Sequence, residues 1–442
     1  MLSENQFEII SEAITPLFDY LEHEIIADIA RRIAKTLTYS RTAELEALAL
    51  KKLGYSPNKI RQEAMKILQA DKTFQKIVED NTIEYKREVK KIIDKTVEKA
   101  KKSGDELIAS AGDMSWIDDM RVWESGGIKL TDNSFLDTLI KAYQMQSTTD
   151  VLNLSKSMGF KAISGWESIE NLYRTELNKA LIKLTSGAYS QSQVVRDTIH
   201  SLAQSGLRSV DYASGRSTQL DSAVRLAVRT ASYQLSAQIQ KQNIQRTDVN
   251  LVYVSQHENA RNQGTGIANH EEWQGKVYYV NPGIDYTEEA KRIGQDSIGD
   301  LWENTGYSLD NKHESNPLGL YGYNCRHRIH PWWEGSSQKP ERIAPKPIVK
   351  WNDRELDGFA QSQEMRRMER NIRNLKRERE ALRTLGEPLE QINARISEHE
   401  NIYRTFCYKC NQRPLWDRCS YECGTSDLTK TDAWKRYKSI AN

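Results

Sequence analysis

The chain of 442 residues lacks the features that mark secreted or membrane-spanning proteins. Its apolar runs all fall short of the roughly 20 residues that a membrane helix needs. Its N-terminus has no basic start followed by an apolar block, so we expect no secretory signal. These two absences predict a protein that is made in the cytoplasm and has no membrane partner.

The chain also has no large excess of positive or negative charge, and its cysteines are not scattered along the sequence. The chain has 63 basic and 61 acidic residues, and a formal net charge of +2 gives no global attraction to nucleic acid or to an acidic membrane. It has five cysteines, four of which lie between residues 407 and 423. An odd number without a signal indicates synthesis under reducing conditions and argues against a disulfide framework.

Long helices are the main prediction from the hydrophobic pattern. Ser3 is a candidate N-cap with Gln6 three positions later, and apolar residues at three- and four-residue steps predict a helix over residues 3–37. Pro16 lies inside this stripe, where it is expected to kink the helix. A second helix is predicted over residues 41–53, ended by Gly54, and a third begins at Pro57.

Glycines then shape the prediction for the central part of the chain. A fourth helix is predicted from about residue 71 or 73 to residue 102, with the basic run 99–102 at its C-terminal end. Glycines from Gly104 onward predict a less regular stretch over residues 104–165. Helices resume at residues 172–184, 194–202 and 220–246, and a loop is expected just before the last of them.

A small sheet and a helical hairpin are predicted in the second half. Residues 251–254 and 276–280 are β-branched and aromatic runs typical of strands, and residues 325–329 are a candidate third strand. A proline-bearing linker follows. Heptad-like spacing over residues 353–406, broken near Gly386, predicts two helices folded as a hairpin. His399 falls on the seam, where it is interpreted as a packed or partner-facing residue and not as a ligand.

The predicted fold is therefore mainly α and elongated: a multi-helix N-terminal region, a small α+β domain, and a C-terminal helical hairpin with a short cysteine-rich tail. The expected segments are a helical region at 1–104, a central helical region at 105–248, the α+β domain at 249–340, a linker at 341–352, the hairpin at 353–406 and the tail at 407–442.

Four side chains of the α+β domain form the first candidate site: His257, His270, Cys325 and His327. Imidazole and thiolate groups suit zinc, and a metal-bound water could attack a phosphodiester or an amide. The third interpretation is a structural polar network. The spacing is not that of a compact zinc finger, because 13 positions separate the first two histidines.

The tail contains the second candidate site. Cys407 and Cys410 form one close pair, Cys419 and Cys423 form another, and eight residues separate the pairs. This spacing is typical of a zinc site with four cysteine ligands, in which four thiolates share one tetrahedral ion. Free thiols and later disulfide formation are the alternatives. Zinc is the only cofactor that the sequence predicts.

Three short motifs, taken in order, resemble the phage minor capsid protein 2 family. They are the run 205–230, then Val254-Ser-Gln-His257 with His270-Glu-Glu-Trp-Gln-Gly-Lys-Val277, and finally Gly319-Leu-Tyr-Gly-Tyr-Asn-Cys-Arg-His327. The likeness extends to about residue 406, and the family is related to the Mu-F-like head-morphogenesis proteins. In this light the following residues are interpreted as a fold signature of the small domain: Trp273, Gly275, Asn324 and Arg326.

The resemblance implies a non-enzymatic, structural protein of a tailed-phage virion, synthesised in the host cytoplasm and located in the head near the portal. It would bind the portal protein and the inner capsid shell, and act in head assembly, DNA packaging or ejection. Self-association through the C-terminal helices is a further candidate interaction. So is contact with phage DNA through Lys86-Arg87, Lys90-Lys91 and Lys99 to Lys102. The rival is a head-delivered, metal-dependent nuclease or toxin-like hydrolase that uses the histidine segment.

Overall fold

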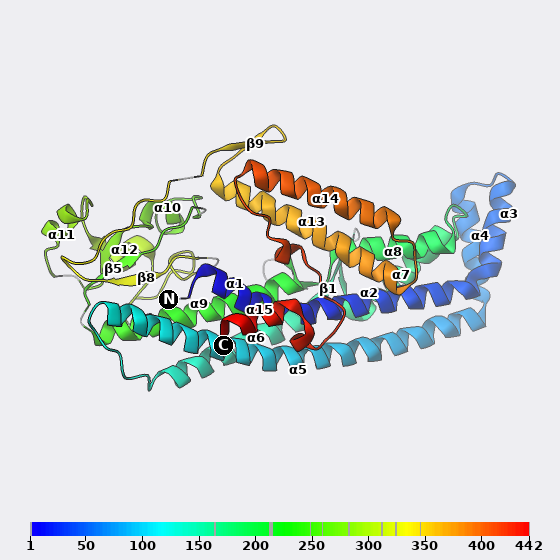
Figure 1. Ribbon diagram of the computed structural model, residues 1–442. Coiled ribbons are helices and arrows are strands. Elements are labelled where there is room, and N and C mark those ends of the chain that lie inside the picture. Colours follow the sequence, from blue (N-terminus) through cyan, green and yellow to red (C-terminus); the bar gives the residue numbers. More distant parts are fainter. Residues whose placement is uncertain are drawn as a thin grey trace.

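The computed structural model describes residues 2–162, 165–211, 215–247, 249–258, 260–281, 283–310, 313–322, 325–344 and 346–441. Asn324 of the predicted fold signature lies outside these residues. The protein is mainly α-helical and elongated, as predicted, with the small mixed domain at one end (Figure 1). Each helix of the described residues is too short or too polar to span a membrane.

The longest helix, α5 (Lys72–Ser125), runs along most of the molecule (Figure 1). Its 54 residues correspond to roughly 80 Å at the rise of an α-helix. The prediction that this helix ends at residue 102 was wrong, and so was the irregular stretch after it. Gly112 does not break α5: a Cβ atom there would lie 2.7 Å from Ile140 and 3.2 Å from Leu235. The glycine allows α6 (Leu136–Lys156) and α9 (Leu220–Arg246) to approach closely.

The N-terminal helices lie along this bundle. Ser3 caps α1 (Glu4–Glu12) through the predicted capping box with Gln6. Pro16 does not kink one long helix. It lies in the first turn of a separate helix, α2 (Thr15–Leu37), where a missing backbone N–H costs nothing.

A helical hairpin projects at the end of the molecule opposite the small domain (Figure 1). The 3-10 turn η1 (Thr38–Ser40) leads into α3 (Arg41–Lys52), and α4 (Pro57–Ala70) returns against it. Both helices follow the prediction, because Gly54 adopts a left-handed φ of 76° and the Ser56 side chain caps α4.

A four-stranded sheet between the central helices was not predicted. Its strand order is β2-β1-β3-β4, all antiparallel, and it includes the expected loop before α9. Helices α7 (Ile169–Leu184) and α8 (Gln191–Ser205) pack beside it. The strands are β1 (Met158–Ala162), β2 (Gly165–Ser168), β3 (Arg208–Val210) and β4 (Ser217–Gln219).

The small domain contains a second sheet of order β7-β6-β5-β8. The strands β5 (Leu251–Val254) and β6 (Val277–Tyr279) confirm the predicted strands. The third predicted strand was misplaced: residues 325–328 precede the strand, which is β8 (Ile329–Trp332). The remaining elements are η2 (Gly266–Ala268), α10 (His270–Trp273), α11 (Thr287–Arg292), β7 (Gly299–Asp300) and α12 (Leu301–Thr305).

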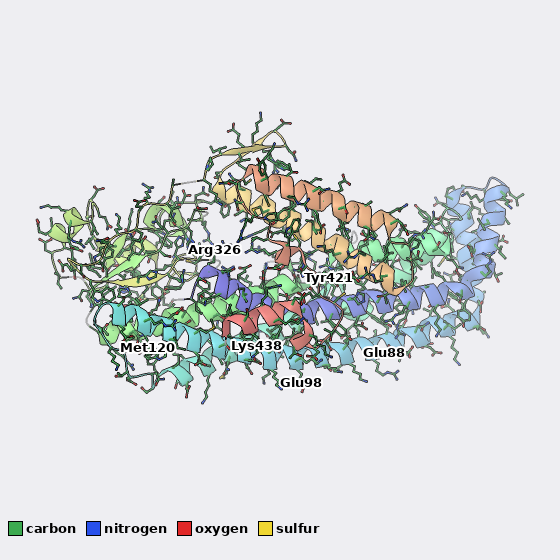
Figure 2. All side chains as sticks on the ribbon, viewed as in Figure 1. Glu88, Glu98, Met120, Arg326, Tyr421 and Lys438 are labelled. Carbon is green, nitrogen blue, oxygen red and sulfur yellow. The ribbon has the colours of Figure 1, made fainter. Side chains whose placement is uncertain are left out.

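The C-terminal hairpin is present as predicted, with α13 (Gly358–Thr384) packed against α14 (Glu390–Lys409). The predicted linker instead contains β9 (Val349–Trp351), which pairs with β10 (Arg354–Leu356). The tail contains η3 (Trp416–Cys419), η4 (Leu428–Lys430) and α15 (Asp432–Ala441). Figure 2 shows Lys438 of α15 above α5, where its ammonium lies 2.6 Å from the Glu106 carboxylate.

One apolar core includes side chains from the N-terminal helices, the central helices, the small domain and the C-terminal hairpin. Buried ion pairs add specific contacts across it. Arg377 of α13 pairs with Glu22 of α2, and both side chains are buried. Arg373, one turn earlier, lies 2.7 Å from Asp19 and 2.6 Å from Asp221. These pairs fix α13 to α2 and α9.

Candidate functional site

The sheet of the small domain brings three of the predicted site residues together. Strand β5 pairs antiparallel with β8, in the register Val254 to Ile329. The chain that leaves β5 and the chain that enters β8 therefore lie at the same edge of the sheet. The Ser255 amide, which donates to the Arg328 carbonyl at 2.8 Å, extends this pairing toward Cys325 and His327.

His270 reaches the same edge from the first turn of α10. The Asn269 side chain caps this short helix by accepting from the Glu271 amide. The Trp273 indole donates to the Ile267 carbonyl at 3.0 Å, and the Gly275 amide donates to the Val254 carbonyl at 3.0 Å. The left-handed φ of 69° at Gly275 allows the tight return into β6. Trp273 and Gly275 thus position the site without being part of it.

The site is a compact cluster of three buried side chains. His270, Cys325 and His327 each offer one ligand atom, and these atoms lie within 4.8 Å of one another. The Cys325 Sγ is 3.7 Å from the His327 Nδ1. Each histidine also has a carbonyl-type oxygen next to Nε2: the Leu318 carbonyl, 2.9 Å from His270, and the Gln274 Oε1, 2.9 Å from His327.

His257 lies beside this group but faces elsewhere. Its ring centroid is 4.9 Å from that of His327, and its Nε2 is 2.7 Å from the Arg326 carbonyl. Its Nδ1 is 3.6 Å from the Glu4 carboxylate of α1. Among the described residues that could bind a metal, the close group therefore contains three of the four predicted side chains, and His257 is not one of them.

Burial keeps these groups neutral. It lowers the pKa of His270 to about 4, and burial together with the neighbouring histidines lowers the pKa of His327 well below its ordinary value. Burial raises the pKa of Cys325 to about 11. Near pH 7 the cluster consists of neutral imidazoles and a thiol. Such groups suit packing or metal binding, and the metal-free thiol is not an activated nucleophile.

Arginines line the cleft on one side of the cluster. The cleft has a volume of about 260 Å³ and lies between the small domain and the start of α13. Burial and the nearby guanidinium groups of Arg326 and Arg418 lower the pKa of Arg366 to about 10. The residues that line the cleft include three histidines and four arginines: His257, His270, His327, Arg216, Arg261, Arg326 and Arg366. Sequence reasoning missed Arg366, because nothing in the heptad pattern of α13 distinguishes it from a solvent-exposed arginine.

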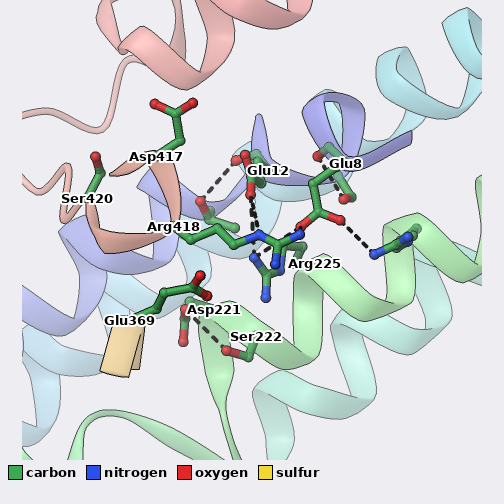
Figure 3. A network of polar contacts seen from close by, with 12 residues as sticks. Glu8, Glu12, Asp221, Ser222, Arg225, Glu369, Asp417, Arg418 and Ser420 are labelled. Atoms are coloured by element: carbon green, nitrogen blue, oxygen red, sulfur yellow. Dashed lines mark hydrogen bonds and ion pairs between the residues drawn. The ribbon is translucent and has the colours of Figure 1, made fainter. Parts of the chain in front are cut away.

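The fold-signature residue Arg326 connects this domain to the rest of the molecule. Its guanidinium lies 2.6 Å from the Glu4 carboxylate at the start of α1 (Figure 2 labels Arg326). One turn further along α1, Glu8 lies 2.6 Å from Arg229 of α9 and 2.9 Å from Arg418 of the tail. Figure 3 shows how this network joins α1, α9 and the tail. Burial together with Glu8 raises the pKa of Glu12 to about 7.

The tail cysteines are all buried, and none is disulfide-bonded. Cys407, Cys410 and Cys419 belong to the apolar cluster between β9, α13 and α14. Burial raises the pKa of Cys407 to about 11 and that of Cys419 to about 12. Within the described residues, which include all four, their sulfur atoms do not form a group close enough for one metal ion. The zinc site proposed for Cys407, Cys410, Cys419 and Cys423 stays a prediction.

Comparison with known proteins identifies the class. The model of the phage minor capsid protein 2 family matches residues 2–407, so the chain belongs to this family of structural phage proteins. A curated relative, a "Structural protein" of Lactococcus phage LL-H, is 22% identical over 250 residues. The match covers 56% of this chain and 60% of that protein. No solved structure matches.

Proposed function

We propose that this structural phage protein binds the portal and the inner capsid shell, and acts in head assembly, DNA packaging or ejection. Family membership supports a role in the virion. The proposed binding to the portal and the inner shell rests on the hairpin of α3 and α4, which projects from one end of the molecule (Figure 1). Apolar side chains of this hairpin are exposed. Exposed apolar groups that cluster on a protein surface typically mark an interaction site.

Helix α3 combines buried small residues with exposed leucines. Ala43 and Ala47 are buried, while Leu45 and Leu48 are 51% and 38% exposed on the other side of α3. Leu53 is 72% exposed in the connecting turn. We name this surface the apolar tip, and it consists of Tyr39, Leu45, Leu48, Leu53 and Tyr55.

The rest of the molecule presents the tip on a rigid support. Lys51 donates to the Gly187 carbonyl at 3.0 Å, and Gln191 donates to the Leu37 carbonyl at 3.1 Å. These contacts tie the last turn of α3 to the turn before α8, and the end of α2 to α8 itself. An interaction surface that is already ordered loses little conformational entropy on binding.

The experiment compares the incorporation of variants into phage particles. Leu45→Ser with Leu53→Ser is expected to reduce copurification with the portal and incorporation into heads by at least tenfold, with unchanged thermal unfolding. The control is Tyr408→Ser on α14, since Tyr408 is 86% exposed and lies outside the tip. Normal incorporation of the double variant, or an equal loss in the control, would contradict the proposed role of the tip.

A further inference from the structure

The cluster of His270, Cys325 and His327 has the geometry of a metal site. In a tetrahedral zinc site with Zn–S near 2.3 Å and Zn–N near 2.0–2.1 Å, a sulfur and a nitrogen ligand lie about 3.6 Å apart. The Cys325 Sγ and the His327 Nδ1 are 3.7 Å apart. The ligand atom of His270 is within 4.8 Å of both. A small movement of side chains would therefore place all three atoms around one ion.

The hydrogen bonds around the histidines select the tautomer that a metal requires. The oxygens of Leu318 and Gln274 can only accept, so the Nε2 atoms of His270 and His327 carry the protons. Each Nδ1 then carries a lone pair, and that of His327 faces the Cys325 thiol at 3.7 Å. Metal-binding histidines commonly donate their second ring nitrogen to a carbonyl or carboxylate oxygen, which holds the ring in place.

We propose that His270, Cys325 and His327 bind one zinc ion, with a water molecule from the arginine-lined cleft as the fourth ligand. On binding, the Cys325 S–H loses its proton to solvent and a Zn–S bond forms, while both histidines bind through Nδ1 and keep their Nε2 protons. The thiolate offsets one of the two charges of the ion.

The ion would cross-link two segments of the small domain. It joins the first turn of α10 to the segment that enters β8. His270 and Cys325, which lie in these two parts, are 55 positions apart in the sequence. The elements between them are short, since α11 has 6 residues and α12 has 5. Short elements of this kind stabilise themselves poorly, and the free energy of zinc binding then adds to that of folding.

The test uses the full chain in a background that removes the tail as a source of zinc, with Cys407→Ser and Cys410→Ser. After loading with zinc and desalting, we expect one zinc per chain by mass spectrometry of the metal. X-ray absorption is expected to show one sulfur and three nitrogen or oxygen ligands. Adding Cys325→Ser or His327→Gln is expected to lower the bound zinc at least fivefold. Adding His257→Gln, which changes a neighbouring ring outside the group, is expected to leave it unchanged.

Cobalt provides a readout that does not depend on these ligand variants folding. Cobalt-loaded protein in the same background is expected to show the charge-transfer absorption of a single thiolate and the visible bands of a tetrahedral ion. Absence of bound zinc and cobalt in this background would overturn the proposal. So would a metal whose ligands include no sulfur, or zinc retained in full by both the Cys325→Ser and His327→Gln variants.

Discussion

A buried carboxylate between α5 and α9 offers a sharp test of how the central bundle is packed. Asp119 is 1% exposed, and its Oδ2 accepts from the Asn243 side-chain amide at 2.5 Å. Burial raises its pKa from the ordinary value of 3.8 to about 6, despite this hydrogen bond. At about 1.4 kcal/mol per pKa unit, ionisation of Asp119 at pH 7.5 costs the folded state roughly 3 kcal/mol.

The sign follows from the raised pKa. Between pH 3.8 and about 6 the folded state binds more protons than the unfolded state, so stability falls as pH rises through this window. Asp119→Asn removes the charge and keeps an acceptor for Asn243. Its new amide group also offers a donor to the Asn243 Oδ1, which has no hydrogen-bond partner among the described residues. We expect the variant to be more stable by about 2–3 kcal/mol at pH 7.5 and nearly unchanged at pH 4.

The assay is urea unfolding followed by circular dichroism at pH 4, 5, 6 and 7.5. The matched control is Asp118→Asn, because Asp118 is the preceding residue and lies 3.4 Å from Arg121 on the surface. Its effect is expected to stay within about 1 kcal/mol at every pH. If Asp119→Asn does not stabilise the protein at pH 7.5, or stabilises it equally at pH 4, then the ionised Asp119 carboxylate does not destabilise the folded state as we infer.

Two further predictions concern the packing of the long helices. Gly112→Ala is expected to destabilise the protein by about 1–3 kcal/mol, because the new Cβ would lie 2.7 Å from Ile140. The control is Gly104→Ala in the same helix, where the nearest neighbour of the new Cβ is 3.9 Å away. This control variant should be more stable than the wild type by up to about 1 kcal/mol. Chemical unfolding of the two variants checks this, and equal effects would refute the close approach. Arg377→Ala leaves Glu22 buried without its partner and is expected to cost about 3–5 kcal/mol, while Arg377→Ala combined with Glu22→Ala should cost less than the sum of the single variants. Additive losses would show that the pair is not coupled.

Local sequence signals predicted the helices that begin and end with standard caps. Ser3 with Gln6, Ser56 before Pro57 and Gly386 between the hairpin helices all mark the boundaries that the structure has. These signals act within a few residues of the chain. They therefore do not depend on the tertiary fold.

The failures came from residues whose role is set by distant neighbours. Gly104 and Gly112 suggested the end of a helix, yet α5 continues through both, and Gly112 is needed there because Ile140 and Leu235 pack directly against it. The first sheet was missed because its strands have three to five residues, too few to show an alternating pattern.

Only part of the candidate site could be predicted, again because distant residues determine its geometry. Residue types indicated that His257, His270, Cys325 and His327 form one set, but only the register of β5 and β8 determines which rings face one another. That register places three side chains within metal-binding distance and turns His257 toward Glu4. The partners that set the tautomers, the Leu318 carbonyl and Gln274, carry no spacing signal of their own.

The most direct test of the proposed role is a cryo-electron microscopy map of the mature virion, reconstructed around the portal vertex without imposed icosahedral symmetry. We expect density for this elongated chain at the portal, inside the head, with the apolar tip of α3 and α4 in contact with the portal or the inner shell. Density confined to the tail or to the outer capsid surface, or complete absence of the chain from the particle, would contradict it.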